Sequence, residues 1–479
     1  MIYSLLLILA LPLAATAGGL DPSAPRGLAI HHFVVPGSGN NNTEMCVIPR
    51  HLPFGKYKAS DSEDEITLCT LDFYKKDGTT EQSSTVAICP KTNSTSAGIL
   101  LYSIPQGKTK ASLETASACA MESGNHRPSG VKNLGKYKQT DDDATCTSTQ
   151  SILGYYHVAR ALGDIGHVNS SVIRTMDFQQ HERVTTLALG QIGRKPASAI
   201  YRSWENFRKY KSGSQANPSW LFTNDDTQIY GAIIGHGVKS DSFTDWVTNK
   251  SNGGTDLTQV SAFKNLKNPA DTNTILGDHA FSPSTVQGLV SMRDMSEMLL
   301  IDYLMSQADR FSGSNIDQTT LYVFQQSGEV KSESDVKKVP SGIQPVPVKS
   351  LVLNDNDCGI IDGPGDAEKK GYFDQIQHFH PETYARLMEL AERWNSGPET
   401  KAFFRTELLF SDKMISDFGK RLMHARDSLK EKCKSSEHFL DLDLDDFIAG
   451  READQSYCDV STFVAMTKKL ESGRSPASK

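Results

Sequence analysis

The stretch DYLMSQADRFSGSN, residues 302–315, joins an apolar, helix-like segment to an acid and a base at its end. Asp309 and Arg310 stand side by side, and glycine and small polar residues follow at once. Two interpretations are open. Asp309 and Arg310 form a solvated helix end before an ordinary turn, or the helix carries Asp309 into a cleft as a reactive carboxylate, with Asn315 as a metal ligand nearby. Taken alone, the stretch favours the first, because charged helix ends are common.

A second stretch, residues 129–162, predicts a strand followed by a helix from about residue 148 to 162. Because side chains alternate along a strand, Lys136 and Lys138 share one face. Another strand-like run, SSVIRTMD, follows at 170–177. A strand–helix–strand unit with a cationic strand is how many lobes that bind ATP hold its phosphates. The alternative is that the two lysines lie on the solvent face of an edge strand.

A third stretch, VKSLVLNDNDCGIIDG at 348–363, predicts a buried strand that ends in acids. Asp355, Asn356 and Asp357 follow the apolar run directly. Buried carboxylates without a cation are costly. Hard oxygen ligands of this kind suit magnesium or manganese bound to phosphates. The alternative is a turn rich in Asx residues.

The composition is that of an ordinary globular protein. The chain has 479 residues, of which 38% are hydrophobic and 22% charged, and its net charge is -7. This length is enough for two or three domains. Because there is no overall basic field, we expect no nucleic-acid partner.

The N-terminus resembles a secretory signal peptide. An apolar run covers residues 2–13, and Ala-Thr-Ala at 15–17 is typical of a cleavage site. No lysine or arginine precedes the run, and a buried N-terminal helix is the alternative. Because no other stretch has the length of a membrane span, we expect none in the mature chain. The predicted location is secreted or periplasmic.

The cysteine pattern favours disulfides over zinc. The eight cysteines form no CxxC pair and no cluster with histidine, and an exported chain meets an oxidising compartment. Several bridges are expected, with a stapled N-terminal region, although the spacing does not reveal the pairing. The cysteines lie at positions 46, 69, 89, 119, 146, 358, 433 and 458.

Strand-like patterns come first along the chain and helical patterns later. The region before residue 124 is rich in Gly, Pro, Ser, Thr and Asn, and helical periodicity dominates from about residue 285. Two polar segments, 249–259 and 327–349, are interpreted as loops. The short strand-like runs before residue 124 are HHFVV at 31–35, EITLCTL at 65–71, STVAICP at 84–90 and GILLYSI at 98–104.

In this order, the lysine strand, the helix, the Asp-Arg helix end and the acidic strand end resemble the secretory-pathway kinases of the Golgi casein kinase family. More distantly they resemble spore-coat kinases and phosphatidylinositol-kinase-like enzymes. The most specific match is DYLMSQADR, residues 302–310, which fits that family's Asp-aromatic-Leu-Met-x-Asn/Gln-x-Asp-Arg pattern. KYKQT, YHVARAL and DNDCG resemble the lysine strand, the following helix and the metal-binding Asp-Asn-Gly. The resemblance covers the chain from about residue 125 to residue 400.

The resemblance implies an α+β fold of the two-lobed atypical protein-kinase type, with a strand-rich N-terminal extension. It implies ATP and magnesium or manganese as cofactors and a hydroxyl-bearing acceptor of unknown class. Asp309 would be the catalytic base, Asp355 and Asn315 metal ligands, and Lys136 or Lys138 the contact to the nucleotide phosphates. The expected segments are 1–17 signal peptide, 18–124 disulfide-bearing extension, 125–235 kinase-like N-lobe and 236–479 mainly helical C-lobe.

Three features of this sequence differ from the family pattern. The segment from Asp309 to Asn315 is one residue longer than in phosphatidylinositol kinases. Asp357, followed by Gly359, also spells Asp-x-Gly and competes with Asp355 as a metal ligand. Ser151 and Ile152 stand near where the family places a glutamate that pairs with the lysine, and Gln150 is the nearest polar substitute. Loss of that pair would loosen the hold on phosphate. The expected function is a metal-dependent phosphotransferase, and the alternative is a pseudokinase or a secreted binding protein.

Overall fold

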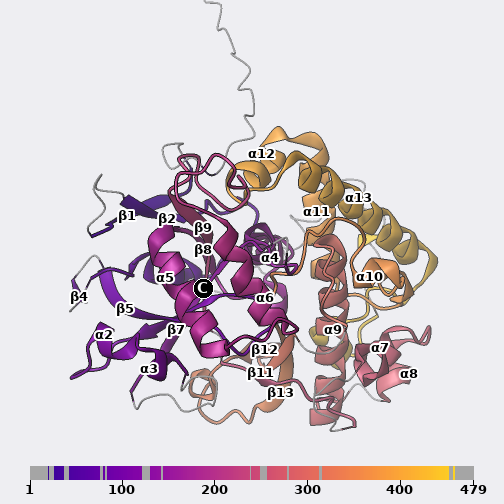
Figure 1. Ribbon diagram of the computed structural model, residues 1–479. Helices are drawn as coiled ribbons and strands as arrows, with labels where there is room; N and C mark the ends of the chain where they lie inside the picture. Colours follow the sequence, from indigo (N-terminus) through magenta and orange to yellow (C-terminus); the bar gives the residue numbers. More distant parts are fainter. Residues whose placement is uncertain are drawn as a thin grey trace, which may run out of the picture.

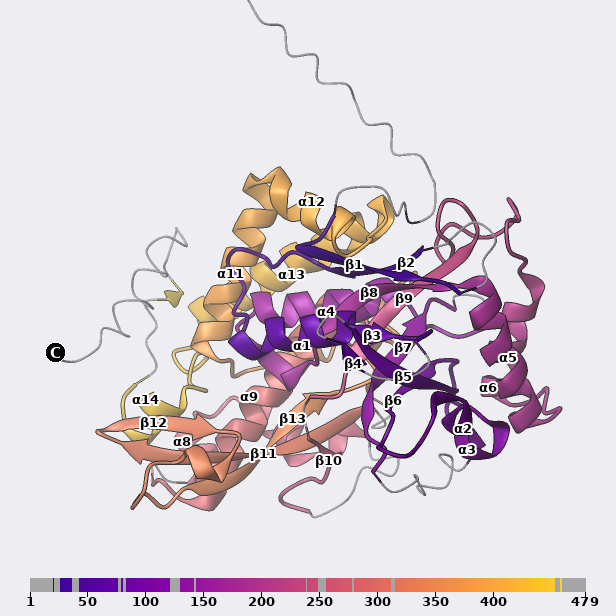
Figure 2. The same ribbon diagram turned by 90° about the vertical axis from the view of Figure 1, so that its left-hand side faces the viewer.

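The computed structural model has mixed helix and sheet, as the α+β prediction expects. Figures 1 and 2 show the strands of the first half beside the helices of the second half. The residues that the structure describes are 20, 26–36, 43–75, 79–80, 83–120, 130–141, 144–237, 239–248, 256–277, 280–311, 315–452 and 457–458. The expected signal peptide lies outside them.

A nine-stranded sheet contains the predicted lysine strand. Its order is β1-β2-β8-β9-β7-β6-β5-β3, with β4 paired to β5, and every pair except β3–β5 is antiparallel. The lysine strand, β7, is therefore an interior strand between β6 and β9. The strands are β1 Ala29–Val34, β2 Thr43–Ile48, β3 Leu71–Asp72, β4 Thr79–Thr80, β5 Ser83–Pro90, β6 Ile99–Ser103, β7 Asn133–Gln139, β8 Ser171–Asp177 and β9 Gln228–Gly235.

The sheet includes strands from both sides of residue 124, where the sequence places a boundary. β6 and β7 pair directly, with Leu100 opposite Lys136. The predicted extension and the predicted N-lobe thus contribute to one sheet, and their division stays a prediction about domains.

A smaller sheet carries the acidic strand end. Its central strand β11 pairs with β10, β12 and β13, all antiparallel. The strands are β10 Asp241–Ser242, β11 Ile316–Gln326, β12 Glu329–Glu333 and β13 Val346–Leu353.

Apolar packing centres on α4, α9 and the C-terminal helices. All thirteen residues of α4 are buried, and this helix contributes to the same apolar cluster as α9, α11 and α13. A second cluster lies between the large sheet and α5 with α6. The helices are α1 Ala59–Cys69, α2 Lys110–Leu113, α3 Ala116–Ala120, α4 Thr149–Ala161, α5 Phe178–Ile192, α6 Ala199–Asn206, α7 Ser261–Leu266, α8 Thr272–Leu276, α9 Pro283–Leu304, α10 Asp366–Lys369, α11 Pro381–Ser396, α12 Pro398–Thr406, α13 Asp412–Ser435 and α14 Leu444–Ile448.

Two sequence patterns were interpreted wrongly. Most of the strand-like run 65–71 is the end of α1, a helix that begins with the Asp61 carboxylate accepting the backbone N–H of Lys58 at 2.8 Å. The segment 327–349, expected to be a loop, contains β12 and the start of β13. A two-residue turn at Ser327 and Gly328, both at positive φ, makes β11 and β12 a hairpin. β12 is mostly exposed and polar, so no apolar alternation marks it.

All eight cysteines form disulfides, as the export prediction requires. The pairs are Cys46–Cys69, Cys89–Cys119, Cys146–Cys358 and Cys433–Cys458. Two of them lie in the N-terminal region, and Cys146–Cys358 joins parts of the chain 212 residues apart.

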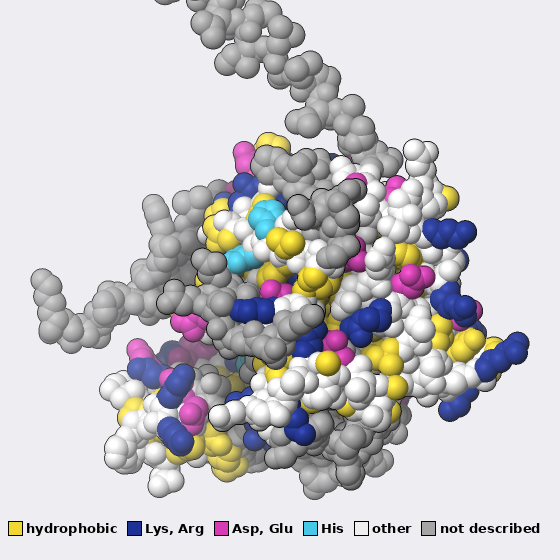
Figure 3. Space-filling model, turned by 60° about the vertical axis from the view of Figure 1, so that its left-hand side comes forward, with side chains coloured by type: hydrophobic (Ala, Val, Ile, Leu, Met, Phe, Trp, Pro, Cys, Tyr) yellow, Lys and Arg dark blue, Asp and Glu magenta, His cyan; other side chains and the backbone are white. Residues whose placement is uncertain are grey.

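Among the described residues no helix has the length and apolar character needed to cross a membrane. On the face that Figure 3 shows, basic and acidic side chains are interspersed, with no large patch of one sign.

Candidate active site

A cavity of about 270 Å³, lined by charged, polar and apolar residues, lies between the large sheet and the loop that follows β13. Strands β6, β7 and β9 form one side, and the ends of β11 and β13 form the other. The lining residues used below are Lys91, Lys136, Asn354, Asp355, Asn356 and Asp317.

The two lysines of β7 share one face, as the alternation predicts, and both reach the loop after β13. The Nζ of Lys136 donates to Asp355, and its side chain is 23% exposed. The Nζ of Lys138 donates to Asp357 Oδ2 at 2.5 Å and to Ser96 Oγ at 2.6 Å, and only 2% of its side chain is exposed. Lys136 is therefore accessible from the cavity, whereas Lys138 is part of the buried framework.

The lysines keep both aspartates ionised. The Lys136 ammonium holds the pKa of Asp355 well below its usual range, with smaller contributions from Lys91 and Lys138. Burial works to raise the pKa of Asp357, but the charges of Lys138 and Lys136 and the hydrogen bond from Lys138 together outweigh it, so that this pKa is also lowered. Two ionised carboxylates, two positions apart in the sequence, are therefore each paired with a lysine of β7.

Asp355 adopts a backbone conformation that is uncommon outside glycine. Its φ is +45°, in the left-handed region. Such strain is often found at functional sites, where the surrounding structure holds the residue in place. Of the two competing aspartates, Asp355 lines the cavity, whereas Asp357 also accepts a hydrogen bond from Thr147 Oγ1 at 3.2 Å.

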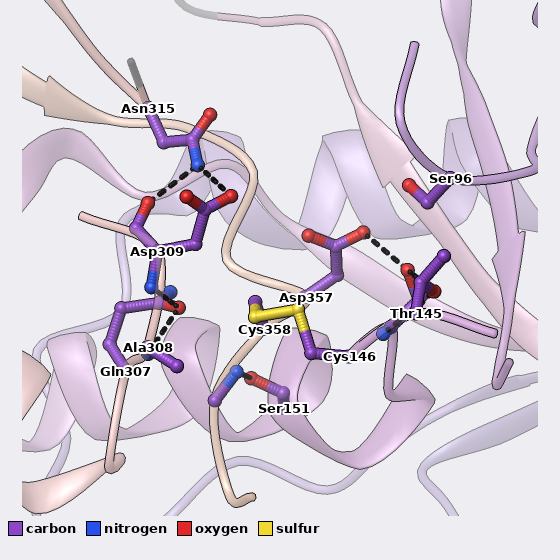
Figure 4. The surroundings of a disulfide bond; sticks show 12 residues. Ser96, Thr145, Cys146, Ser151, Gln307, Ala308, Asp309, Asn315, Asp357 and Cys358 are labelled. Carbon is purple, nitrogen blue, oxygen red and sulfur yellow. Dashed lines mark hydrogen bonds between the residues drawn. A yellow bond between two sulfur atoms is a disulfide. The ribbon is translucent and has the colours of Figure 1, made fainter. Parts of the chain in front are cut away.

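Asp309 lies on a loop and not on the helix that the sequence predicted to carry it. The helix α9 ends at Leu304, and Ser306 has a φ of +52°. The Asp309 N–H donates to Gln307 Oε1 at 3.2 Å. The Nδ2 of Asn315 donates to the backbone oxygen of Asp309 at 2.6 Å and to its Oδ2 at 2.8 Å (Figure 4). Asn315 therefore orients the Asp309 carboxylate.

Arg310 joins the Asp309 loop to the loop that carries Asp355. Its guanidinium is fully buried and pairs with Asp302 at 3.1 Å. The same side chain donates to the backbone oxygens of Asn315 and Asn354, the latter at 2.6 Å, and to Asn356 Oδ1 at 2.6 Å. The interpretation of Arg310 as a solvated helix end is therefore wrong, because its donors are used by buried acceptors.

The register of the smaller sheet brings Asn315 beside the acidic loop. Ile316 pairs with Leu353, so the residues just outside that pair face one another. The Asn354 N–H accordingly donates to the Asn315 oxygen at 3.3 Å. Residues far apart in the sequence, Asp309 and Asp355, are thus held on adjacent loops.

Sequence reasoning missed Lys91, which lines the cavity from the end of β5. Burial, with a further contribution from the Lys138 charge, lowers the pKa of Lys91 to about 8. The signal was present, because Lys91 opens the turn-forming segment KTNSTSAG between two strand-like runs. Its proximity to β7 depends on the order β5-β6-β7 in the sheet, which the sequence alone does not give.

Asp317 on β11 is a second missed residue. Its Oδ2 accepts hydrogen bonds from Ser240 Oγ at 2.9 Å and Asn354 Nδ2 at 2.6 Å, and it lines the cavity. Asp317 thereby links the β11 strand to the acidic loop.

Helix α4 contacts the acidic loop through Ser151, near the position where the resembled family has a glutamate. The Ser151 Oγ donates to the Asn356 oxygen at 2.6 Å and accepts the Gly359 N–H at 2.9 Å. A Cβ on Gly359 would lie 2.5 Å from that Oγ, so glycine is required for this approach. Gln150, the other polar candidate on α4, hydrogen-bonds to Ser148 Oγ at 3.0 Å.

Oxygen ligands from Asp355, which lines the cavity, and from Asn315, which lies on the adjacent loop outside the lining, suit a hard divalent cation that is bound together with phosphates. Asp355 offers a carboxylate, and the amide oxygen of Asn315 points away from Asp309 (Figure 4). Among the described residues no cluster of three or more His, Cys, Asp or Glu side chains has the geometry of a metal site. An ion here would therefore complete its coordination with phosphate oxygens and water, as magnesium does in many nucleotide sites.

Comparison with known proteins gives a distant structural similarity. No protein-family model matches the sequence, and no curated protein matches it. Among solved structures, the chain is similar to the crystal structure of the Golgi casein kinase, with 11% identity, a TM-score of 0.37, and coverage of 74% of this chain and 76% of the other. The Golgi casein kinase with Mn/ADP bound gives the same identity and TM-score, with 74% of each chain covered. This distant structural similarity is to the same family that the sequence motifs resemble.

Proposed function

We propose that this protein is a metal-dependent phosphotransferase that moves the γ-phosphate of ATP to a hydroxyl acceptor. The observation that carries the proposal is the pairing of Lys136 with Asp355 in the lining of the cavity, with Asp309 tied to the same loop through Arg310. Cations for phosphate, an oxygen ligand for a metal ion and a carboxylate base are the parts that phosphoryl transfer needs.

The chain's residues have distinct roles in this reaction. Lys136 and Lys91 attract the phosphates, and Asp355 and Asn315 hold magnesium or manganese, which neutralises charge on the transferring group. The acceptor hydroxyl gives its proton to a carboxylate oxygen of Asp309 while its oxygen bonds to the γ-phosphorus. The bond from that phosphorus to the bridging oxygen breaks, and ADP leaves with the electron pair. Lys138 and Asp357 support the loop that carries Asp355.

The acceptor is a protein Ser or Thr, a glycan or a metabolite. The four disulfides and the apolar leader support export, to a secreted or periplasmic location. In this proposal, residues 125–235 form the nucleotide-binding lobe and residues 236–479 the helical one, with 18–124 as an added segment.

Thermal shift with ATP and manganese, followed by transfer of labelled phosphate to generic acceptors, tests the proposal. Asp355→Ala should abolish the metal-dependent shift. Asp362→Asn is the matched control, because it changes an exposed acid that pairs with the surface residue Lys413. This variant should bind the metal and ATP as wild type does. A wild-type protein that gains no stability from ATP with either metal would contradict the proposal.

The second candidate is a pseudokinase that binds nucleotide without turnover. The specific observation in its favour is Ser151, which bonds to backbone atoms at the position where the resembled family has an acid. Nucleotide binding without phosphate transfer to any acceptor, and without ATP hydrolysis, would favour this candidate.

A further inference from the structure

Cys358 lies where three parts of the candidate site meet. Its sulfur is bonded to Cys146, just before α4. Its backbone oxygen accepts the N–H of Ala308, the residue before Asp309, at 3.1 Å. It also follows Asp357, the partner of Lys138. Figure 4 shows the disulfide between the Asp309 side of the site and the Asp357 side.

The disulfide is flanked by bonds that hold the same loop on the same helix. The Ser148 N–H donates to the Asp357 oxygen at 2.8 Å, and the Thr147 hydroxyl donates to the Asp357 carboxylate at 3.2 Å. Ser151 bonds to the backbone on both sides, at Asn356 and Gly359. The loop is therefore attached to the start of α4 by a covalent bond and by four hydrogen bonds.

We propose that the Cys146–Cys358 disulfide is a positioning element of the site, which sets the Asp355 and Asp309 loops relative to the lysines of β7. This inference rests on the proposed function. A carboxylate on a helix that pairs with a lysine on a strand is one way to couple the two elements. Here Lys138 pairs with Asp357 on the loop, and the disulfide with Ser151 couples that loop to α4. Because rigid placement is most of the catalysis in phosphoryl transfer, loosening this coupling should affect metal and nucleotide binding directly.

The double variant Cys146→Ser, Cys358→Ser tests the proposal, with Cys433→Ser, Cys458→Ser as the control. The control also removes one disulfide, but from the C-terminal end of α13. Both are compared with wild type at a temperature at which circular dichroism shows all three folded. Binding of Mn²⁺ with ADP is followed through loss of the free-ion signal in electron paramagnetic resonance.

We expect the Kd for Mn²⁺ with ADP to rise about tenfold or more in the Cys146, Cys358 variant and less than about twofold in the control. In the protein without ligand, amide exchange over residues 354–360 and 307–309 should be faster in the first variant only. A purely stabilising bridge would alter the unfolding temperature and leave both readouts unchanged in the folded protein.

Ser151→Ala provides a second variant in case the double variant does not fold, with Ser296→Ala as its control. Ser296 is equally buried, but its hydroxyl bonds within α9 to Arg293. Ser151→Ala should weaken Mn²⁺–ADP binding, and Ser296→Ala should not. If wild type binds Mn²⁺ with ADP and the disulfide and Ser151 variants bind it equally well, the positioning proposal is overturned alone. A wild type that binds neither Mn²⁺ nor ADP overturns the proposed function as well.

Discussion

At the scale of single residues, Asp309 shows how the meaning of one side chain depends on its neighbours. The Asn315 amide fixes its carboxylate, and Arg310 fixes the loop from within the core. A surface acid would not need two such supports. The sequence suggested Asp309 through a motif, but its supports are visible only in the fold.

Asp309→Asn keeps the shape of the side chain and removes its capacity to accept a proton. If Asp309 is the base, turnover should fall by about 10²-fold or more. Metal-dependent ATP binding should survive, because the proposed metal ligands are Asp355 and Asn315. Steady-state transfer assays and isothermal titration measure the two effects separately. Full activity in the variant would remove Asp309 from the mechanism.

Lys91 gives a pH dependence to nucleotide binding. Its pKa is lowered to about 8 by burial and by the neighbouring lysine charge, so it loses its proton as the pH rises from 7 to 9. The charged form favours phosphate, and affinity for ADP with Mg²⁺ should therefore fall about threefold or more across this range. Titrations of the wild type at pH 7 and pH 9 measure the fall.

Lys91→Arg is the control, because arginine stays charged at both pH values. The variant should show no comparable loss of affinity at pH 9. An equal loss in both proteins would place the titrating group elsewhere.

At the scale of elements, the sequence predicted best the segments whose burial is periodic. The helix α4, the strands β7 and β8 and the start of the acidic loop after β13 all appear where the patterns indicated. The edge strand β12 was missed because edge strands are short and polar, and the end of α1 was missed because a few β-branched residues outweighed its N-terminal cap.

The candidate site could be predicted only in part, for a physical reason. Lys136 and Asp355 carry local signals, a strand face and a strand end. Their contact, and the approach of Lys91, depend on strand order and on register across the two sheets, which are set by packing over long sequence distances. The partner of Cys358 likewise could not be read from spacing.

Arg310 is expected to stabilise the junction of β11 and β13. In Arg310→Ala, Asp302 would remain buried without its partner, and loss of one member of a buried pair typically costs about 3–5 kcal/mol. Burial already raises the pKa of Asp302, and loss of the Arg310 charge would raise that pKa further. Urea unfolding of the variant measures the loss. Arg405→Ala, which breaks a surface pair with Asp412, should change stability by less than about 0.5 kcal/mol.

At the scale of the whole molecule, buried histidines make the fold sensitive to acid. Burial lowers the pKa of His181 to about 3, from 6.5 in the unfolded chain. A group with a lowered folded pKa contributes stability above its unfolded value, and that stability is lost as the pH falls. At pH 5 the loss from this residue is about 2 kcal/mol. The pKa values of four other histidines are lowered in the same direction, at positions His31, His157, His167 and His380.

His181→Phe should reduce the acid dependence, because the ring remains among Trp204 and Phe207 and no longer binds a proton. The free energy of unfolding, measured between pH 5 and pH 7.5, should fall less steeply in the variant. Two buried glutamates act against the trend, because burial raises the pKa of Glu44 and of Glu297 to about 7. The fall in stability of the wild type between pH 7.5 and pH 5 is therefore expected to be smaller than these histidines alone would give. His438→Asn, an exposed position, should leave the slope unchanged.

The bond between Cys146 and Cys358 also makes the middle of the chain a closed covalent ring, since 212 positions separate its ends. A ring must be cut twice before any piece is freed. Lys331 on β12 and Lys337, which follows that strand, are exposed and lie inside the ring, so we expect trypsin to cut there. A molecule nicked there should migrate as one species on a gel without reductant and as two with it, so the protein can lose chain continuity and still keep both halves of its candidate site in one molecule.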